Sequence, residues 1–407
     1  MPGGPESLVF PIRSIAMNPI RVGIVGVGFA GKFHYEALQN VHGVEVEIVG
    51  ATSKTEENRE AFCTERGIKP FDSVEAMLDE IDLLDICSPP YVHEANILAA
   101  AERGKHVICE KPLTGYFGPP GADESWRGDT EPKGPMLEEV RERLARIDNA
   151  VKKADITFGY AENFVYAPTV QKEREVIEKT KAQLLRMTGE ESHSGSGSPV
   201  YGIWRYVGGG SLMGKGCHPL TALLYLKRVE GEATGAGPIR PKSVTSRTHQ
   251  LTRVPKYRDL GFLRTDYHDI EDYGWMHVVF EDGTVADVVV GETTLGGCYD
   301  YLEIFANNHR TRCRISPTNL LDIYNPKAEQ FEDIYLVEKI SSKEGWSPAA
   351  PDENWTMGYT AEMQDFLTCA AKGTKPICGL ELAMDTMRVI YAAYLSDEQK
   401  GVEVTIS

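Results

Sequence analysis

The feature that most constrains the fold is an apolar run followed by a glycine-rich turn near the start of the chain. Residues 20–25 read Ile-Arg-Val-Gly-Ile-Val, which is typical of a buried strand, and a helical pattern covers 32–40. Between them lie Gly26, Gly28 and Gly31, with the spacing G-x-G-x-x-G. In this context the glycines permit a sharp turn, the approach of a pyrophosphate and close packing of helix on strand. The pattern predicts a dinucleotide site at the helix N-terminus.

Strands and helices alternate as far as about residue 160, which predicts a doubly wound parallel sheet. The expected strands after the first are 44–51, 83–87, 106–109 and 156–160, and the expected helices are 56–67, 73–80, 92–103 and 136–153. Two polar segments follow strands, Ser88-Pro89-Pro90 and Glu110-Lys111-Pro112. They are expected at the carboxyl edge of the sheet, where ligands bind. Lys111 could donate to a substrate oxygen there, although a surface loop lysine has the same pattern.

The end of the second expected strand bears on the choice of cofactor. A ribose-binding acid is expected about 20 residues after the glycines, but the chain has Thr52-Ser53-Lys54. A hydroxyl beside a cation suits a 2′-phosphate and favours NADP, whereas Ser53 could also hydrogen-bond the ribose of NAD. Lys54 could equally be a solvated loop residue. The sequence therefore predicts NAD or NADP.

A segment dense in glycine and proline, residues 115–135, interrupts the alternation directly after Lys111. Such a composition predicts a long loop without regular structure. The loop carries Tyr116, Phe117, Trp126 and Arg127. Aromatic rings and an arginine beside a site favour a lid or a subunit contact, and a mobile surface insertion is the alternative.

Strand patterns dominate after residue 161. The expected strands are 183–190, 242–250, 275–280, 284–290, 301–305, 312–315, 320–324 and 402–406, with helices over 211–226, 359–372 and 380–398. The fold class is therefore α/β, with an N-terminal Rossmann sheet and a C-terminal α+β domain built on a large, open, mainly antiparallel sheet. The expected domains are an arm over 1–20, a Rossmann domain over 21–160 that contains the 115–135 insertion, and a substrate and oligomerisation domain over 161–407.

The charge and the cysteines exclude several classes of partner. A formal net charge of -17 argues against nucleic acid and against an anionic membrane surface. The eight cysteines form no C-x-x-C pair, which is typical of reduced thiols in a cytoplasmic protein. No apolar run is long enough to span a bilayer, and residues 1–18 do not have the pattern of a signal peptide. We expect no metal.

A second glycine-rich segment, Gly208-Gly209-Gly210, precedes Lys215 and His218. Lys215 and His218 are three residues apart and are expected near one face of a helix. A histidine titrates near neutral pH and can carry the proton of an alcohol-to-ketone conversion, although a lone histidine is more often structural.

Taken together, these segments resemble the Gfo/Idh/MocA family of nicotinamide-dependent oxidoreductases over essentially residues 21–406. The resemblance rests on the first glycine turn, the Cys87–Pro90 segment with His93, Glu110-Lys111-Pro112-Leu113, and the run from Gly208 to His218. It implies a sugar, glycoside or cyclitol hydroxyl held over the nicotinamide, with Lys111 binding the reacting oxygen and His218 as acid/base. It also implies a homodimer or homotetramer that uses the open sheet.

The site residues expected on this basis form three groups. Lys111 and His218 are expected to be catalytic. The cofactor residues are Gly26, Gly28, Phe29, Ala30, Ser53, Lys54, Ser88, Pro89, His93, Glu110 and Lys111. The substrate residues are Lys111, Asn163, Trp204, Arg205, Lys215 and His218.

The chain departs from the family pattern four residues before the histidine. The family usually has an aspartate there, and this chain has Gly214 followed by Lys215. Without the acid, a second cation should lower the pKa of Lys111 and make it a better base. Lys215 is expected to face the site and to bind an anionic or strongly polar substituent.

Two alternatives to a net sugar dehydrogenase or reductase stay open. The first is a glycoside hydrolase that uses NAD transiently. Oxidation of a ring hydroxyl acidifies the neighbouring C–H, and elimination, water addition and re-reduction then give hydrolysis without net redox change. The second is a non-enzymatic NAD(P)-binding sensor, against which the intact Lys111 and His218 argue.

Overall fold

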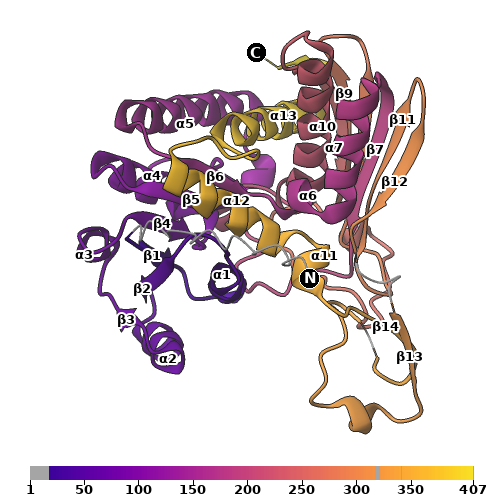
Figure 1. Ribbon diagram of the computed structural model, residues 1–407. Coiled ribbons are helices and arrows are strands. Elements are labelled where there is room, and N and C mark those ends of the chain that lie inside the picture. Colours follow the sequence, from indigo (N-terminus) through magenta and orange to yellow (C-terminus); the bar gives the residue numbers. More distant parts are fainter. Residues whose placement is uncertain (1–17, 317–320, 341, 407) are drawn as a thin grey trace, which may run out of the picture.

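The molecule has two large β-sheets with helices packed on them and a small third sheet of two strands (Figure 1). The computed structural model describes residues 18–316, 321–340 and 342–406. Most of the predicted N-terminal arm lies outside these residues. In the described part of the chain, none of the helices has the length and apolar character needed to cross a bilayer.

The N-terminal sheet has six parallel strands in the order β3-β2-β1-β4-β5-β6. The strands are β1 (Ile20–Val25), β2 (Val46–Thr52), β3 (Lys69–Pro70), β4 (Leu83–Ile86), β5 (His106–Glu110) and β6 (Phe158–Ala161). Four helices connect them: α1 (Phe29–Gln39), α2 (Glu56–Arg66), α4 (His93–Glu102) and α5 (Lys133–Ala154), with the short α3 (Val74–Leu78). The order reverses between β1 and β4, so a ligand crevice is expected at their carboxyl ends. The predicted doubly wound sheet is confirmed.

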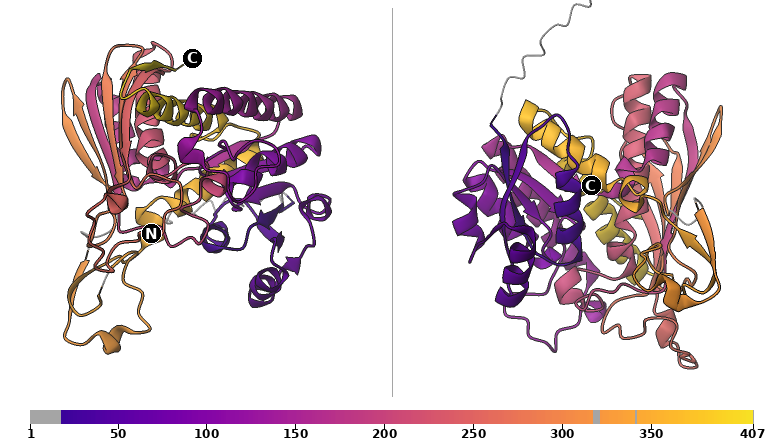
Figure 2. Two further views of the ribbon diagram at one scale, coloured as in Figure 1. Left: turned by 180° about the vertical axis from the view of Figure 1, so that it is seen from behind. Right: turned by 60° about the horizontal axis from the view of Figure 1, so that its bottom comes forward.

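The second sheet has seven strands in the order β12-β11-β7-β10-β9-β8-β15. They are β7 (Leu184–Ser192), β8 (Pro241–His249), β9 (Tyr273–Phe280), β10 (Val285–Gly291), β11 (Tyr299–Ala306), β12 (Arg310–Arg314) and β15 (Val404–Thr405). Only β7 and β10 run parallel to each other, so the predicted open and mainly antiparallel sheet is confirmed. Helices α7 (Pro168–Thr180) and α10 (Cys217–Thr234) lie beside one face of it (Figure 2).

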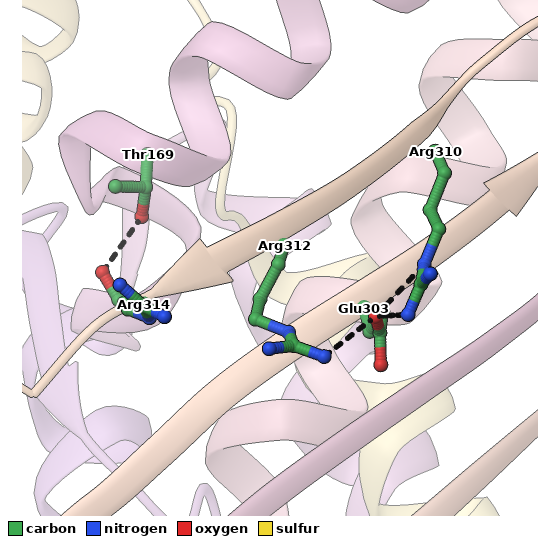
Figure 3. A pocket seen from close by; sticks show the side chains of 5 residues that line it. All are labelled: Thr169, Glu303, Arg310, Arg312 and Arg314. Atoms are coloured by element: carbon green, nitrogen blue, oxygen red, sulfur yellow. Dashed lines mark hydrogen bonds and ion pairs between the residues drawn. The ribbon is translucent and has the colours of Figure 1, made fainter.

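The other face of this sheet has no helix on it within the described chain, as the two views of Figure 2 show. Its residues alternate in burial along β9 and β10, as a half-solvated sheet requires. A surface depression of about 590 Å³ lies at its edge, lined by Thr169, Glu303, Arg310, Arg312 and Arg314 (Figure 3). Arg312 donates to Glu303 at 3.1 Å, and Arg310 donates to the same carboxylate. Charged side chains on an edge strand discourage pairing with another strand. The predicted oligomer contact on this sheet stays a prediction.

The last helices of the chain return to the Rossmann sheet. Helix α12 (Tyr359–Lys372) packs against α1, and α13 (Leu380–Glu398) packs between α5 and β8. The Phe366 ring fills the space where a side chain at Gly159 would lie. The two sheets are therefore joined by packed helices as well as by the chain connection at Ala161.

The structure differs from the sequence-based expectation at several places, among them helix α7, which was not expected. The helix expected over 211–226 is broken into α9 (Ser211–Gly214) and α10, with Lys215 and Gly216 between them. The insertion contains a 3-10 turn at Gly128–Thr130, and α5 begins at Lys133 rather than Met136. A two-stranded sheet, β13 (Leu321–Asn325) with β14 (Gly345–Ala349), contains a strand that was not expected. The remaining elements not yet named are the short helices α6 (Asn163–Tyr166), α8 (Trp204–Val207) and α11 (Glu353–Thr356).

Candidate active site

The three glycines of the first turn have three different surroundings. Gly26 has a φ of +95°, and a Cβ there would come within 2.7 Å of the Cys87 backbone. A Cβ on Gly31 would overlap the carbonyl oxygen of Gly26, whereas a Cβ on Gly28 would meet no atom within 4 Å. Helix α1 begins at Phe29 with no side-chain cap, and Phe29 is 64% exposed. Open space before uncapped N–H groups fits the pyrophosphate of a dinucleotide.

The other predicted cofactor residues lie along the same carboxyl edge. Ala30 is in the first turn of α1, and Ser53 and the exposed Lys54 directly follow β2. Ser88 and Pro89 follow β4, and the buried Ser88 hydroxyl oxygen has no hydrogen-bond partner among the described residues. An unpartnered buried hydroxyl beside the glycine turn is a free group for a ligand.

His93 connects two strand ends rather than facing the crevice. Its Nε2 lies 2.7 Å from the Ser88 carbonyl oxygen and its Nδ1 lies 3.0 Å from that of Pro112. The ring is fully buried, and burial lowers its pKa. We therefore assign His93 the role of positioning the two loops, in place of the predicted direct contact with the cofactor.

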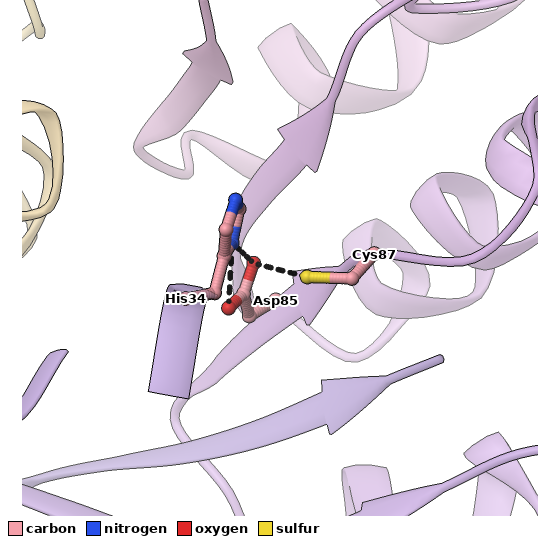
Figure 4. Close-up of side chains that lie close together, drawn as sticks. All are labelled: His34, Asp85 and Cys87. Atoms are coloured by element: carbon pink, nitrogen blue, oxygen red, sulfur yellow. Dashed lines mark hydrogen bonds and ion pairs between the residues drawn. The ribbon is translucent and has the colours of Figure 1, made fainter. Parts of the chain in front are cut away.

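Glu110 is held by a buried network that the sequence analysis did not identify. His34 is on α1. The Nε2 atom of His34 lies 3.1 Å from Glu110 Oε1, and the Nδ1 atom of the same ring lies 2.8 Å from Asp85 Oδ1. Figure 4 shows His34 and Asp85 meeting beside Cys87. Burial opposes protonation of His34, but Asp85 outweighs it and the net pKa is raised well above its ordinary value. A protonated His34 between two carboxylates fixes Glu110 at the end of β5.

Lys111 extends from the end of β5 toward the second domain. Its Nζ donates to the Gly214 carbonyl oxygen at 3.1 Å. Burial opposes its charge, but Cys217, Glu191 and Glu110 outweigh burial and the pKa of Lys111 is raised. Burial also raises the pKa of Cys217 well above its ordinary value, so this thiol is neutral near pH 7. The glutamates therefore stabilise the lysine charge, and the predicted lowering of the Lys111 pKa is wrong.

His218 is placed between two glutamates at the start of α10. Its Nδ1 lies 2.5 Å from Glu162 Oε1, and its Nε2 lies 3.7 Å from Glu191 Oε2. The ring stacks on Phe164 at 4.9 Å. Burial lowers the pKa of His218 to about 4 and raises that of Glu162 to about 8. Like Lys111 after β5, Glu162 directly follows a strand of the parallel sheet, here β6.

Lys215 is not the free cation that the sequence suggested. It is 2% exposed, and its Nζ donates to Glu292 Oε1 at 2.6 Å. The Tyr201 hydroxyl donates to the same oxygen at 2.6 Å. A Cβ on Gly214 would lie 2.6 Å from the Tyr201 ring, so this ring occupies the space of the aspartate that the family resemblance implies. The charge of Lys215 is therefore neutralised by Glu292 within a buried hydrogen-bonded cluster.

Replacing Lys215 with methionine should therefore destabilise the protein rather than change only its affinity for substrate. Removing one partner of a buried ion pair typically costs about 3–5 kcal/mol, because the other charge stays buried and unpaired. Urea unfolding should show this loss, and adding Glu292→Gln should restore part of it. A Lys215→Met protein of unchanged stability with a raised KM would instead support the original prediction.

The other predicted substrate residues are more scattered. Asn163 is buried beside Glu162, and its Nδ2 donates to the Met357 carbonyl oxygen at 2.9 Å. Trp204 is 2% exposed, and its Nε1 donates to the Tyr116 carbonyl oxygen at 3.1 Å. Arg205 is partly exposed. These contacts place Trp204 in the packed junction with the insertion, and we do not include it in the proposed substrate site.

The insertion is tied to the second domain along its length. The backbone N–H of Tyr116 donates to the Tyr391 hydroxyl at 2.6 Å, and that of Gly128 donates to Asp269 at 2.8 Å. Arg127 donates to Asp129 and to the His268 carbonyl oxygen, both at 2.8 Å. These bonds hold the described loop against α13 and residues 268–269, and its arginine is already paired within the molecule.

The described residues thus define a dinucleotide-binding Rossmann domain whose strand ends meet a lysine, a histidine and several glutamates. Residues 20–118 match the family model described as "Oxidoreductase family, NAD-binding Rossmann fold", GFO_IDH_MocA. Over these residues the match confirms the resemblance seen in the sequence.

Curated relatives match over parts of the chain. Glucose-6-phosphate 3-dehydrogenase of Bacillus subtilis is 33% identical over 93 residues, which are 23% of this chain and 26% of that protein. D-glucoside 3-dehydrogenase of Escherichia coli is 26% identical over 222 residues, which are 52% of this chain and 55% of that protein. The chain therefore matches between about a quarter and about half of the length of these two relatives.

Solved structures match over nearly the whole chain. The crystal structure of GenD2 from gentamicin A biosynthesis, in complex with NAD, has a TM-score of 0.77 and 19% identity and covers 98% of this chain and 99% of that one. Levoglucosan dehydrogenase in complex with NADH and levoglucosan has a TM-score of 0.70 and 19% identity, with 95% and 99% covered. At these identities the likeness establishes the fold of both domains.

Proposed function

We propose that this chain transfers a hydride between a nicotinamide dinucleotide and a ring hydroxyl of a sugar, glycoside or cyclitol. The observation that carries the proposal is the position of Lys111 and His218. Both lie at the carboxyl edge of a Rossmann sheet of the NAD-binding oxidoreductase family. The named sugar dehydrogenases among its relatives support the substrate class.

The glycine turn, Ser88 and Glu110 are the groups that would hold the cofactor, whose nicotinamide ring supplies the hydride acceptor when bound. Lys111 is cationic and would donate a hydrogen bond to the reacting oxygen, which stabilises negative charge on that oxygen as its proton leaves. His218 Nε2 would accept the hydroxyl proton, while Glu162 holds Nδ1 and fixes the orientation of the ring. In the reverse direction the same nitrogen returns the proton.

The Glu162–His218 pair gives this scheme a pH dependence. With pKa values of about 8 for Glu162 and about 4 for His218, the pair carries one extra proton between these limits. That proton must leave before Nε2 can act as a base. We therefore expect kcat/KM for sugar oxidation to rise about tenfold per pH unit below pH 8 and to level off above it, as for a single essential base.

Steady-state oxidation rates from pH 5.5 to 10 would check this expectation. Glu162→Gln should abolish the limb near pH 8, because the remaining histidine would titrate alone. If Glu162→Gln leaves this rise of kcat/KM with pH unchanged, the proton that must leave belongs to another group.

One observation favours the hydrolase alternative as a second candidate. Burial raises the pKa of Glu162 to about 8, so this carboxyl group keeps a proton near pH 7. Carboxyl groups that keep a proton near pH 7 can donate it to a departing aglycone. Release of nitrophenol from nitrophenyl glycosides with NAD bound, but without NADH accumulation, would identify this activity.

A panel of sugars, methyl glycosides and inositols tests the main proposal. Each would be mixed with the protein and with NAD or NADP, and absorbance at 340 nm would be followed. Reduction of the cofactor by one or more members is expected. Binding of cofactor and sugar without turnover or aglycone release would favour a sensor instead.

A further inference from the structure

Two neighbouring carboxyl groups on the second sheet have no role in the hydride-transfer scheme above. Glu191, on β7, lies opposite Asp300, on β11, in the antiparallel register. Their side chains therefore lie on the same face of the sheet, the face covered by the helix that carries His218. Glu191 Oε2 lies 3.7 Å from His218 Nε2, on the side of the ring opposite Glu162.

Asp300 is buried and the Glu191 side chain is 12% exposed, and each has a buried oxygen atom without a hydrogen-bond partner among the described residues. Asp300 is 4% exposed, and neither its Oδ1 nor Oε2 of Glu191 is hydrogen-bonded within the described chain. A buried polar group without a hydrogen-bond partner destabilises the fold, and two carboxylates directly opposite each other on a sheet add a further cost. A ligand that supplies hydrogen-bond donors would relieve both costs.

The cations near this pair are already bound within the protein. Lys215 is paired with Glu292. Lys339 Nζ donates to the Gly195 carbonyl oxygen at 3.0 Å and lies 3.6 Å from Glu338. Lys111, the remaining lysine that acts on Glu191, is the one assigned to the reacting oxygen. A phosphate or carboxylate on the substrate would therefore lie next to the carboxyl pair, and none of these three lysines would be free to neutralise it.

We propose that Glu191 and Asp300 form a substrate subsite that binds the hydroxyl or amino groups of an uncharged or basic sugar ring and discriminates against sugar phosphates and uronates. The inference rests on the proposed function for the location of the ring. An uncharged or basic ring takes the place of the anionic substrate substituent that Lys215 was expected to bind. The Tyr201 ring leaves no space for a carboxylate at position 214. The proposed subsite supplies a carboxylate from β7 instead.

Ligand binding to the NADH-loaded protein tests this subsite separately from catalysis. Calorimetry or saturation-transfer NMR would compare methyl glucoside, galactoside and mannoside with their uronates, and glucosamine with glucose 6-phosphate. The wild type should bind at least one uncharged or basic ring about tenfold or more tightly than its anionic counterpart.

Glu191→Gln and Asp300→Asn should each weaken binding of the preferred ring by about tenfold or more and narrow its advantage over the anion. Glu190→Gln is the matched control, because its neighbour in the register, Val289, lies on the outer side of the sheet. Circular dichroism and NADH affinity would show that each variant is folded.

The outcomes separate the two proposals. Discrimination that depends on Glu191 but comes without turnover would support the subsite and contradict the oxidoreductase. Equal or tighter binding of the uronates and phosphates would overturn the subsite. So would failure to bind any uncharged or basic ring, or binding that Glu191→Gln leaves unchanged.

Discussion

Replacing Lys111 with methionine should lower kcat for sugar oxidation by about 100-fold or more, the usual scale for loss of a positioned acid/base group. The lysine is the cation at the end of β5, and the surrounding glutamates keep it charged. Methionine has a similar length, so the packing changes little, although the Gly214 carbonyl oxygen loses its donor. Stopped-flow measurement of NADH formation at saturating sugar would give the rate of the chemical step.

NADH affinity and the urea midpoint are the controls for this variant. The NADH affinity should stay close to the wild-type value. The free energy of unfolding should fall only by the cost of one unpaired carbonyl, about 1–3 kcal/mol. Lys153→Met, an exposed substitution on α5, should change none of these quantities. If Lys111→Met keeps the wild-type kcat, Lys111 is a structural link between the domains and not a catalytic residue.

Replacing Gly28 with valine should strongly weaken cofactor binding without unfolding the protein. A Cβ at this position meets no protein atom within 4 Å, and the φ of −76° suits any residue. The valine would therefore project into the space where a pyrophosphate must approach the backbone. We expect the Kd for NADH to rise by about 100-fold or more, which corresponds to about 2.8 kcal/mol.

Two other glycine substitutions make this result specific. Gly134→Val, on α5, also meets no atom within 4 Å and should leave NADH binding unchanged. Gly31→Ala should instead lower the stability of the fold, because its Cβ would overlap the Gly26 carbonyl oxygen. Fluorescence titration with NADH and thermal unfolding would separate these effects. Normal NADH binding by Gly28→Val would contradict the dinucleotide site.

The Rossmann half of the fold was predictable because its signals are local. An apolar strand, three glycines and a helix follow one another within residues 20–40, and Gly26 and Gly31 have the close contacts that the spacing implies. The open sheet of the second domain could also be predicted, since its strands alternate with a period of two. The break between α9 and α10 was missed because the apolar pattern continues across Lys215 and Gly216.

The electrostatics of the site could not be predicted in the same way, because they depend on contacts between residues far apart in the sequence. Glu191 and Glu162 reach His218 from β7 and β6, and Glu292 reaches Lys215 from the end of β10. From position 214 alone, Lys111 seemed to lack carboxylates, whereas several surround it. His34 had one usable signal, its place three residues after Gly31 on the face of α1 that packs on the sheet.

Transfer of deuterium from sugar to cofactor tests the proposed chemistry most directly. Each sugar that the protein binds would be labelled with deuterium at its ring carbons and incubated with the protein and NAD, and the cofactor would be examined by mass spectrometry. The wild type should yield NADH that carries one deuterium, and Lys111→Met should yield little or none in the same time. Unlabelled cofactor from the wild type with every bound sugar would contradict hydride transfer from a ring carbon.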